Sequence, residues 1–247
     1  MTTHATSGKQ WTESELASLP VENEFRLRGL EVSRLDTFID AAFAFVLTLL
    51  VISFDEIPSN FADMVDAMKR IPAFAFSFAA LMMFWLAHRR WSRRYGVEDS
   101  GTIPLSLVII FVVLVYVYPL RTISEGLFAD LSGDYFPSTF RIGKDDELRG
   151  VLVFFSAGFL TLSLLFNQLY RVTLRHSTPL ALNEIELRFT RINMHAWAVA
   201  ASLGLVSILL ALTVPDSWIP VAGYLYFGLL LAMALPSYLD RRSRARE

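Results

Sequence analysis

Residues 108–117 read Val-Ile-Ile-Phe-Val-Val-Leu-Val-Tyr-Val, at the centre of a stretch from residue 101 to residue 120 that contains no charged side chain. Its β-branched residues would suit a strand in water. Its length and its freedom from charge, however, suit the roughly 20-residue helix that crosses the hydrocarbon layer of a bilayer. Lipid offers the backbone no hydrogen-bond partner, so such a run must bond internally, as a helix does. The stretch predicts a transmembrane helix.

Five other apolar stretches share this character, and the sequence therefore predicts an all-α membrane protein of six transmembrane helices. They are residues 37–54, 71–87, 150–170, 192–214 and 217–239. Only Pro215 and Asp216 separate the last two, which predicts a tight helical hairpin. The expected organisation is a polar segment (1–33) without the apolar core of a signal peptide, a six-helix domain (34–239) and a basic tail (240–247).

The composition excludes several classes of function. Hydrophobic residues make up 54% of the chain and charged residues 19%. The net charge of −2 says little about partners, and we expect no nucleic-acid partner. With no cysteine, the chain has no disulfide, thiolate metal site or cysteine nucleophile. No glycine-rich nucleotide motif or nucleophile elbow occurs, and we interpret the acidic run 145–147 as a solvated loop surface. We expect neither an enzyme nor a bound metal or cofactor.

The basic residues predict how the chain is oriented. With six spans, sixteen of the 22 Lys and Arg residues fall in the segments that share a side with the two termini. Cytoplasmic loops carry the excess of Lys and Arg in multi-pass proteins. The sequence therefore predicts a protein of the cell membrane with both termini in the cytoplasm and the loop 122–148 outside.

Asp40 is the unusual residue of the first span. A carboxylate at the centre of a bilayer costs roughly 2.5–3.5 kcal/mol on insertion scales. One interpretation places Asp40 at the interface, where it favours the positive end of the helix dipole. The other gives it a polar partner. Arg34 lies about 120° away around a regular helix, so such a partner must come from another helix or another subunit.

The residues around Asp40 resemble the first helix of the transmembrane protein 175 family of cation channels. That family carries Arg-x-x-x-Phe-Ser-Asp followed by a small, apolar run ending in Thr-Leu-Leu. Here Arg34, Phe38, Asp40 and Thr48-Leu-Leu fit in register, whereas Ile39 replaces the motif serine. In the second span, Ser77-Phe and Trp85-x-x-His88 resemble the family's Ser-Phe and Trp-x-x-His patterns. The family's asparagine in the third helix has no counterpart near Val108.

The resemblance implies a passive, potassium-permeable channel of the prokaryotic single-repeat type, a homotetramer lined by the first helix of each subunit. The family has no carbonyl filter, and rings of apolar side chains form the narrow part of its pore. Matched by position, these would be Phe45, Leu49 and Ile52, with Thr48 supplying a hydroxyl. Arg34, Phe38, Asp40, Ser77, Trp85 and His88 would form the polar motif network. The partners would be potassium ions, the bilayer and the chain itself, and proton permeation stays open.

Helical spacing places residues 38, 41, 45, 49 and 52 on one stripe, independently of the resemblance. In an arbitrary membrane helix such a stripe packs against neighbouring helices or lipid, and a histidine such as His88 lies at the interface. In the family pattern, His88 would be a polar partner of Arg34 or Asp40. The alternative function is a proton-coupled transporter with Asp40 and His88 as relay groups. It is weaker, because the spans carry no ladder of buried acids and no broken repeat. We interpret Trp197 as an interfacial anchor.

Overall fold

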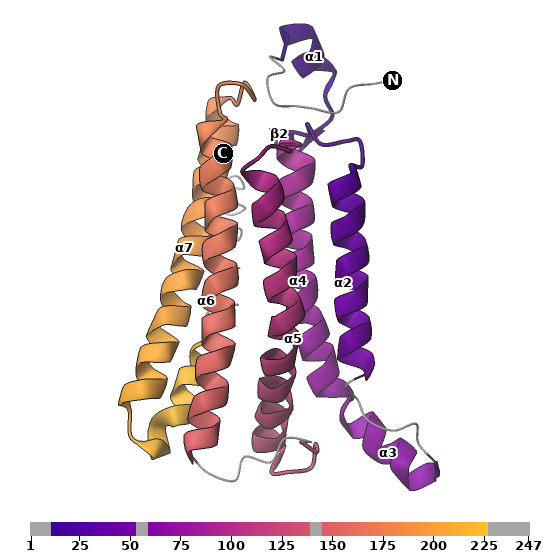
Figure 1. Ribbon diagram of the computed structural model, residues 1–247, viewed down its shortest axis with the longest axis vertical. Coiled ribbons are helices and arrows are strands. Elements are labelled where there is room, and N and C mark those ends of the chain that lie inside the picture. The colour runs from indigo at the N-terminus through magenta and orange to yellow at the C-terminus, as the bar shows by residue number, and fades with distance from the viewer. Residues whose placement is uncertain (1–10, 53–58, 139–144, 227–247) are drawn as a thin grey trace, which may run out of the picture.

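The computed structural model describes residues 11–52, 59–138 and 145–226, and in this part the chain forms a bundle of long, roughly parallel helices (Figure 1). Two strands and three short helices accompany them. The elements in chain order are α1 (Glu13–Ser18), β1 (Val21–Glu22), β2 (Phe25–Arg26), α2 (Arg34–Ile52), α3 (Phe61–Lys69), α4 (Ile71–Tyr95), α5 (Thr102–Ser132), α6 (Asp145–Arg175), α7 (Glu184–Thr213) and the 3₁₀ helix η1 (Asp216–Trp218).

Five of the described helices, α2, α4, α5, α6 and α7, are long and apolar enough to span a membrane. They correspond to the first five predicted spans. The chain turns through η1 directly after α7 and is helical again over residues 219–226, which confirms the tight connection at Pro215 and Asp216. The rest of the sixth predicted span, and the basic tail, lie outside the described residues.

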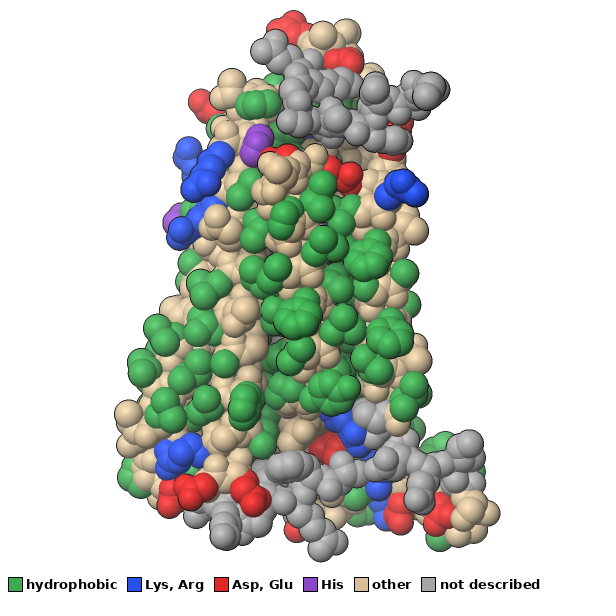
Figure 2. Space-filling model, in the orientation of Figure 1, with side chains coloured by type: hydrophobic (Ala, Val, Ile, Leu, Met, Phe, Trp, Pro, Cys, Tyr) green, Lys and Arg blue, Asp and Glu red, His purple; other side chains and the backbone are tan. Residues whose placement is uncertain are grey.

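The surface agrees with a membrane position. Hydrophobic side chains cover the middle of the face shown in Figure 2, and charged side chains gather toward the two ends of the bundle. We call the end where α2 begins and where α4 and α6 terminate the basic end, because Arg89, Arg90, Arg93, Arg94 and Arg175 lie there.

The spans are longer than the sequence predicted, and the prediction of a loop over 122–148 is wrong for much of its length. The loop expected at 122–148 is mostly helical, since α5 continues to Ser132 and α6 begins at Asp145. The acidic run 145–147 therefore starts a helix, where carboxylates favour the positive end of the dipole. Apolar patterning marks only the part of a helix within lipid, whereas backbone bonding carries the helix on into the aqueous layer. The polar segment 1–33 also has structure, in α1 and the β1–β2 hairpin.

Aromatic side chains fill the core between α4, α6 and α7. Phe84 is fully buried, and its ring lies 6.1 Å from that of Phe166 and 6.2 Å from that of Trp197. Trp197 stacks on Phe166 with ring centroids 4.5 Å apart and is only 5% exposed. The prediction of an interfacial role for Trp197 is therefore wrong, because the indole packs inside the bundle.

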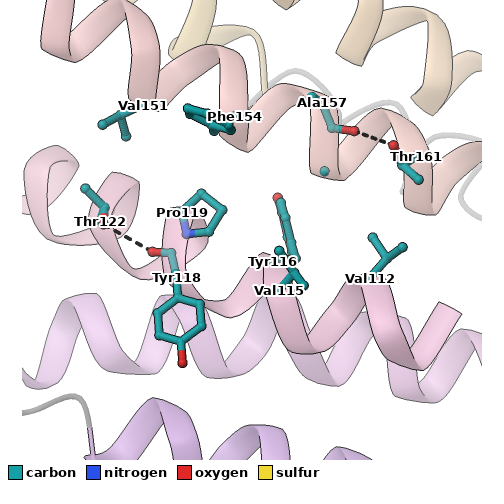
Figure 3. A pocket seen from close by; sticks show the side chains of 11 residues that line it. Val112, Val115, Tyr116, Tyr118, Pro119, Thr122, Val151, Phe154, Ala157 and Thr161 are labelled. Atoms are coloured by element: carbon teal, nitrogen blue, oxygen red, sulfur yellow. Dashed lines mark hydrogen bonds between the residues drawn. The ribbon is translucent and has the colours of Figure 1, made fainter. Parts of the chain in front are cut away.

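A shallow groove of about 480 Å³ separates α5 from α6 around Pro119 (Figure 3). Proline lacks the N–H that would bond to the fourth residue before it, so α5 is locally weakened there. The nearby hydroxyls of Thr122 and Thr161 donate to carbonyls of their own helices, at Tyr118 and Ala157. The groove is therefore a mainly apolar surface.

Gly158 lets α5 and α6 approach at this groove. A Cβ at residue 158 would overlap the ring of Tyr116, with Cε2 only 3.0 Å away. Tyr116 is 2% exposed and cannot move outward without losing its packing against Phe155, 5.5 Å between ring centroids. Small residues commonly allow close helix contacts in membranes.

We predict that Gly158→Ala lowers the melting temperature of the protein in detergent, because the added methyl forces α5 and α6 apart. Gly150→Ala is the matched control on the same helix, since a Cβ there meets no atom within 4 Å. Replacing an open helical glycine by alanine stabilises a helix by about 0.5–1 kcal/mol. Equal melting temperatures for the two variants would contradict the close contact.

Candidate functional site

Helix α2 divides into a buried face and an unpartnered face. Ile39, Phe43, Val46 and Leu50 are at most 1% exposed and pack toward α4 and α5. Their spacing of four, three and four residues defines one side of a helix. The other side is largely exposed among the described residues, although its side chains are also large and apolar.

The stripe predicted for the pore lies on this unpartnered face. Phe38 is 54% exposed, Phe45 56% and Ile52 69%, while Leu49 is half-buried. The Thr48 hydroxyl is exposed and donates to the carbonyl oxygen of Ala44 at 3.0 Å. In contrast, Ile39, which stands where the motif has serine, points into the core. The serine-to-isoleucine change thus adds apolar packing inside the bundle rather than a side chain on the stripe.

Asp40 has a partner on another helix. The indole Nε1 of Trp85 donates to the Asp40 carboxylate at 2.7 Å, joining α2 to α4. The Arg89 guanidinium lies 5.2 Å from the centre of the Trp85 ring, where a cation is attracted to the aromatic face. The exposed Asp40 is therefore held by an aromatic donor near a cationic side chain.

The other predicted network residues do not join this pair. His88 is 3% exposed, and its Nε2 lies 3.0 Å from the Ser106 hydroxyl on α5. The prediction that His88 partners Arg34 or Asp40 is wrong in this structure, because the ring turns inward between α4 and α5. Arg34 is exposed and has no hydrogen bond or ion pair among the described residues.

Ser77 is likewise separate. Its hydroxyl donates to Ser124 on α5 at 2.8 Å, and Ser124 in turn donates to its own helix. Eight residues separate Ser77 from Trp85, which is about 12 Å along a helix. The motif residues on α4 therefore form separate contacts at different depths, and only Trp85 reaches α2. No group of three potential metal ligands occurs in the described parts of the chain.

The beginning of α2 is fixed by contacts that the sequence analysis missed. Asp36 accepts a hydrogen bond from the Ser92 hydroxyl on α4 at 2.6 Å. Ser33 accepts from the Asp36 backbone N–H at 2.9 Å, as an N-cap does. The pattern Ser33-x-x-Asp36 was the available signal for this helix start.

The segment before α2 is tied to α4 through the backbone. The N–H groups of Arg28 and Gly29 donate to the carbonyls of Arg94 and Arg93, at 3.3 and 3.0 Å. The last carbonyls of a helix have no partner within it, so this segment caps α4. A Cβ at Gly29 would overlap the Ser92 carbonyl, which explains the absence of a side chain at this crossing.

A fully buried ion pair ties the same segment to α7. The Arg28 guanidinium bonds to both Glu186 carboxylate oxygens, at 3.1 and 2.8 Å, and both side chains have no exposed area. Arg28 also donates to the carbonyl of Leu180 at 2.9 Å. Glu186 accepts from the Arg26 backbone N–H and completes the capping box of α7 with Asn183. A buried, hydrogen-bonded salt bridge therefore joins the segment before α2 to α7 at the basic end.

Five apolar helices of membrane-spanning length and a hydrophobic belt define a multi-pass membrane protein. The model of the endosomal/lysosomal potassium channel TMEM175 family matches residues 34–119, from the start of α2 into α5. A potassium channel of Marivirga tractuosa is 33% identical over 215 residues, which cover 82% of this chain and 85% of that protein. The chain belongs to the TMEM175 family of potassium channels.

The fold agrees with this membership. A crystal structure of a variant of the potassium channel MtTMEM175, in complex with a Nanobody-MBP fusion protein, superposes with a TM-score of 0.76. The two proteins are 27% identical, and the match covers 90% of this chain and 99% of that chain. The similarity thus extends well beyond the residues that the family model matches.

We predict that Glu186→Gln lowers the melting temperature sharply, because it leaves the Arg28 charge buried without a carboxylate. Breaking one side of a buried pair costs about 3–5 kcal/mol. Glu184→Gln is the control, since Glu184 is exposed two residues earlier on the same helix. Thermal unfolding in detergent would measure both variants, and a Glu186→Gln protein as stable as the control would show that the pair contributes little.

Proposed function

We propose that the chain forms a tetrameric, potassium-permeable channel in the cell membrane, lined by the unpartnered face of α2 from each subunit. The observation that carries the proposal is this face: its side chains are large and apolar, and the described part of the chain leaves more than half of Phe38, Phe45 and Ile52 exposed. One helix cannot enclose a pore, so the face must meet copies of itself. Family membership favours potassium as the ion.

The proposed constriction consists of Phe45, Leu49 and Ile52, with the Thr48 hydroxyl beside it. A narrow apolar ring expels water, and an ion that enters must shed part of its hydration shell. Potassium releases that shell more readily than sodium, so the ring favours potassium. Phe45 is the bulkiest of the three side chains, and its faces offer a cation a weak attraction, about 0.5–2 kcal/mol in other settings. Protons would pass only if water filled the apolar ring.

The polar contacts at the basic end fit a supporting role. Asp40 and Trp85 join α2 to α4 beside the proposed pore, and Asp36 with Ser92 joins the same helices near the start of α2. Both termini would face the cytoplasm, as the basic residues indicate. The transporter alternative loses support, because Asp40 bonds to an indole that cannot relay a proton and His88 bonds to Ser106 instead.

We expect Phe45→Ala to raise cation flux into liposomes and to reduce the preference for potassium over sodium, since a wider neck lets ions keep more of their shell. Phe45→Asn should raise flux further by placing polar groups where dewetting forms the barrier. Influx of potassium, of sodium and of a large organic cation into vesicles containing purified protein would be compared.

Phe43→Ala is the matched control, because Phe43 is 1% exposed and packs into the bundle. It should lower stability and leave ion preference unchanged. If Phe43→Ala alters selectivity while Phe45→Ala does not, the proposed pore face is the wrong face of α2. If wild-type vesicles take up no potassium down a gradient, the channel proposal itself fails.

A further prediction concerns Asp40 and Trp85. Asp40→Ala and Trp85→Phe should each weaken flux or tetramer stability, and the double variant should lose little more than either alone. Contacting residues commonly show coupling of about 0.5–3 kcal/mol. Glu22→Ala, an exposed carboxylate on β1, combined with Trp85→Phe should give additive effects. If the losses caused by Asp40→Ala and Trp85→Phe are additive, the two side chains do not act together, and Asp40 serves only at the start of the helix.

A further inference from the structure

Helix α3 is a short helix formed by its own local contacts. Asn60 caps it by accepting from the Asp63 backbone N–H at 3.0 Å, and the Asp63 carboxylate accepts from the Ser59 hydroxyl at 2.6 Å. This hydrogen bond from Ser59 lowers the pKa of Asp63, so the carboxylate stays ionised. At its other end the Arg70 N–H bonds to the carbonyls of Ala67 and Met68. Local hydrogen bonds therefore cap both ends of the helix.

One face of α3 is an apolar stripe that stays exposed among the described residues. We define the α3 stripe as Phe61, Met64, Val65 and Met68, whose spacing places them on one side of the helix. These side chains are 75%, 41%, 39% and 59% exposed, and no residue of α3 is buried. Four adjacent apolar side chains of this size form a patch that typically marks an interaction site.

The position of α3 limits what can cover the stripe. Figure 1 shows α3 extending beyond the bundle on the side of α2, at the end where α2 terminates and opposite the basic end. Among the described residues α3 contacts α4, and the Lys69 ammonium lies 5.6 Å from the centre of the Tyr135 ring. The helix thus reaches into the space next to α2, away from its own α6 and α7.

The charges of α3 argue against a lipid surface. Helices that lie on membranes are typically rich in Lys and Arg on their polar face. On α3 that face carries Asp63 and Asp66, and its single cation, Lys69, is paired with Asp66 at 2.8 Å. An anionic lipid surface would repel this face, so a protein surface is the better partner.

We propose that the α3 stripe docks on a second copy of this chain, the neighbouring subunit of the tetramer, at the mouth of the pore opposite the basic end. This inference rests on the proposed function, because only a pore lined by α2 puts neighbouring subunits on the α2 side of the bundle. There, α3 spans the subunit boundary and buries its stripe, while Asp63 and Asp66 remain in water.

Photo-crosslinking from the stripe tests this docking. The chain, reconstituted in vesicles of neutral and anionic phospholipid, would carry p-benzoylphenylalanine in place of Phe61 or, separately, of Met68. Ala62 and Ala67, which lie about 110° to either side of the stripe centre, are the control positions. After illumination, positions 61 and 68 should give covalent dimers, and larger adducts up to tetramers, several-fold more strongly than positions 62 and 67.

Two outcomes would overturn the proposal. Adducts that add only the mass of a lipid at positions 61 and 68 would assign the stripe to the membrane surface. Equal or absent inter-subunit adducts at all four positions would show that the stripe meets no neighbour.

A second pair of variants measures the same contact without a crosslinker. Met64→Gln with Met68→Gln should lower the temperature at which the tetramer dissociates in detergent. Ala62→Gln with Ala67→Gln should change it little. Equal dissociation temperatures for the two double variants would contradict docking through the stripe.

Potassium flux measured in the crosslinking vesicles separates the two proposals. Vesicles that conduct potassium while all four positions lack inter-subunit adducts overturn the docking and leave the channel standing. Strong adducts from positions 61 and 68 in vesicles that carry no flux support the docking and contradict the channel.

Discussion

Helix α2 is apolar on both its inner and its outer face over most of its length. It can bury only one of these faces against its own bundle. Ile39, Phe43, Val46 and Leu50 take the inner face, and the bundle has no second wall for the outer one. An apolar outer face is stable in contact with lipid. If the same face lines a pore, it controls whether water and ions can remain there. In the proposed channel, function therefore depends on what the outer face of α2 meets rather than on the packing of its inner face.

The contacts at the basic end hold α2 in this position. The segment before α2 caps α4 with its backbone and reaches α7 through the buried Arg28–Glu186 pair. A buried ion pair is weak support for stability in itself, since desolvation offsets much of its attraction. The guanidinium, however, bonds to backbone carbonyls as well as to the carboxylate. This set of bonds fixes where the chain enters α2. Three segments that are distant in sequence thereby meet at one end of the bundle.

Several polar groups inside the bundle are paired between helices. His88 with Ser106 and Ser77 with Ser124 each join α4 to α5, and the Ser156 hydroxyl lies 2.8 Å from that of Ser207, joining α6 to α7. Between helices in lipid such bonds contribute modestly, on average about 0.6 kcal/mol. They also fix the rotation of each helix about its axis, because each pair admits only one facing arrangement. For α2, the bonds from Trp85 to Asp40 and from Ser92 to Asp36 on the α4 side have this effect.

The sequence by itself determined the class of protein, the first five spans, the hairpin at Pro215 and the family. These follow from hydropathy and from a motif whose residues are close together in the chain, so local pattern is sufficient. The stripe at residues 38, 41, 45, 49 and 52 was also readable, since helical spacing alone places these residues together. The ends of the helices could not be predicted from the sequence, because backbone hydrogen bonding continues beyond the apolar pattern. In α5, for example, it continues to Ser132.

Only the tertiary structure decided the partners. Asp40 bonds to Trp85 and not to His88, Trp197 stacks inside the core, and Arg28 meets Glu186 across 158 residues of chain. The physical reason is the same in each case. A side chain's contacts depend on the rotation and depth of two helices relative to each other, and the packing of the whole bundle sets these.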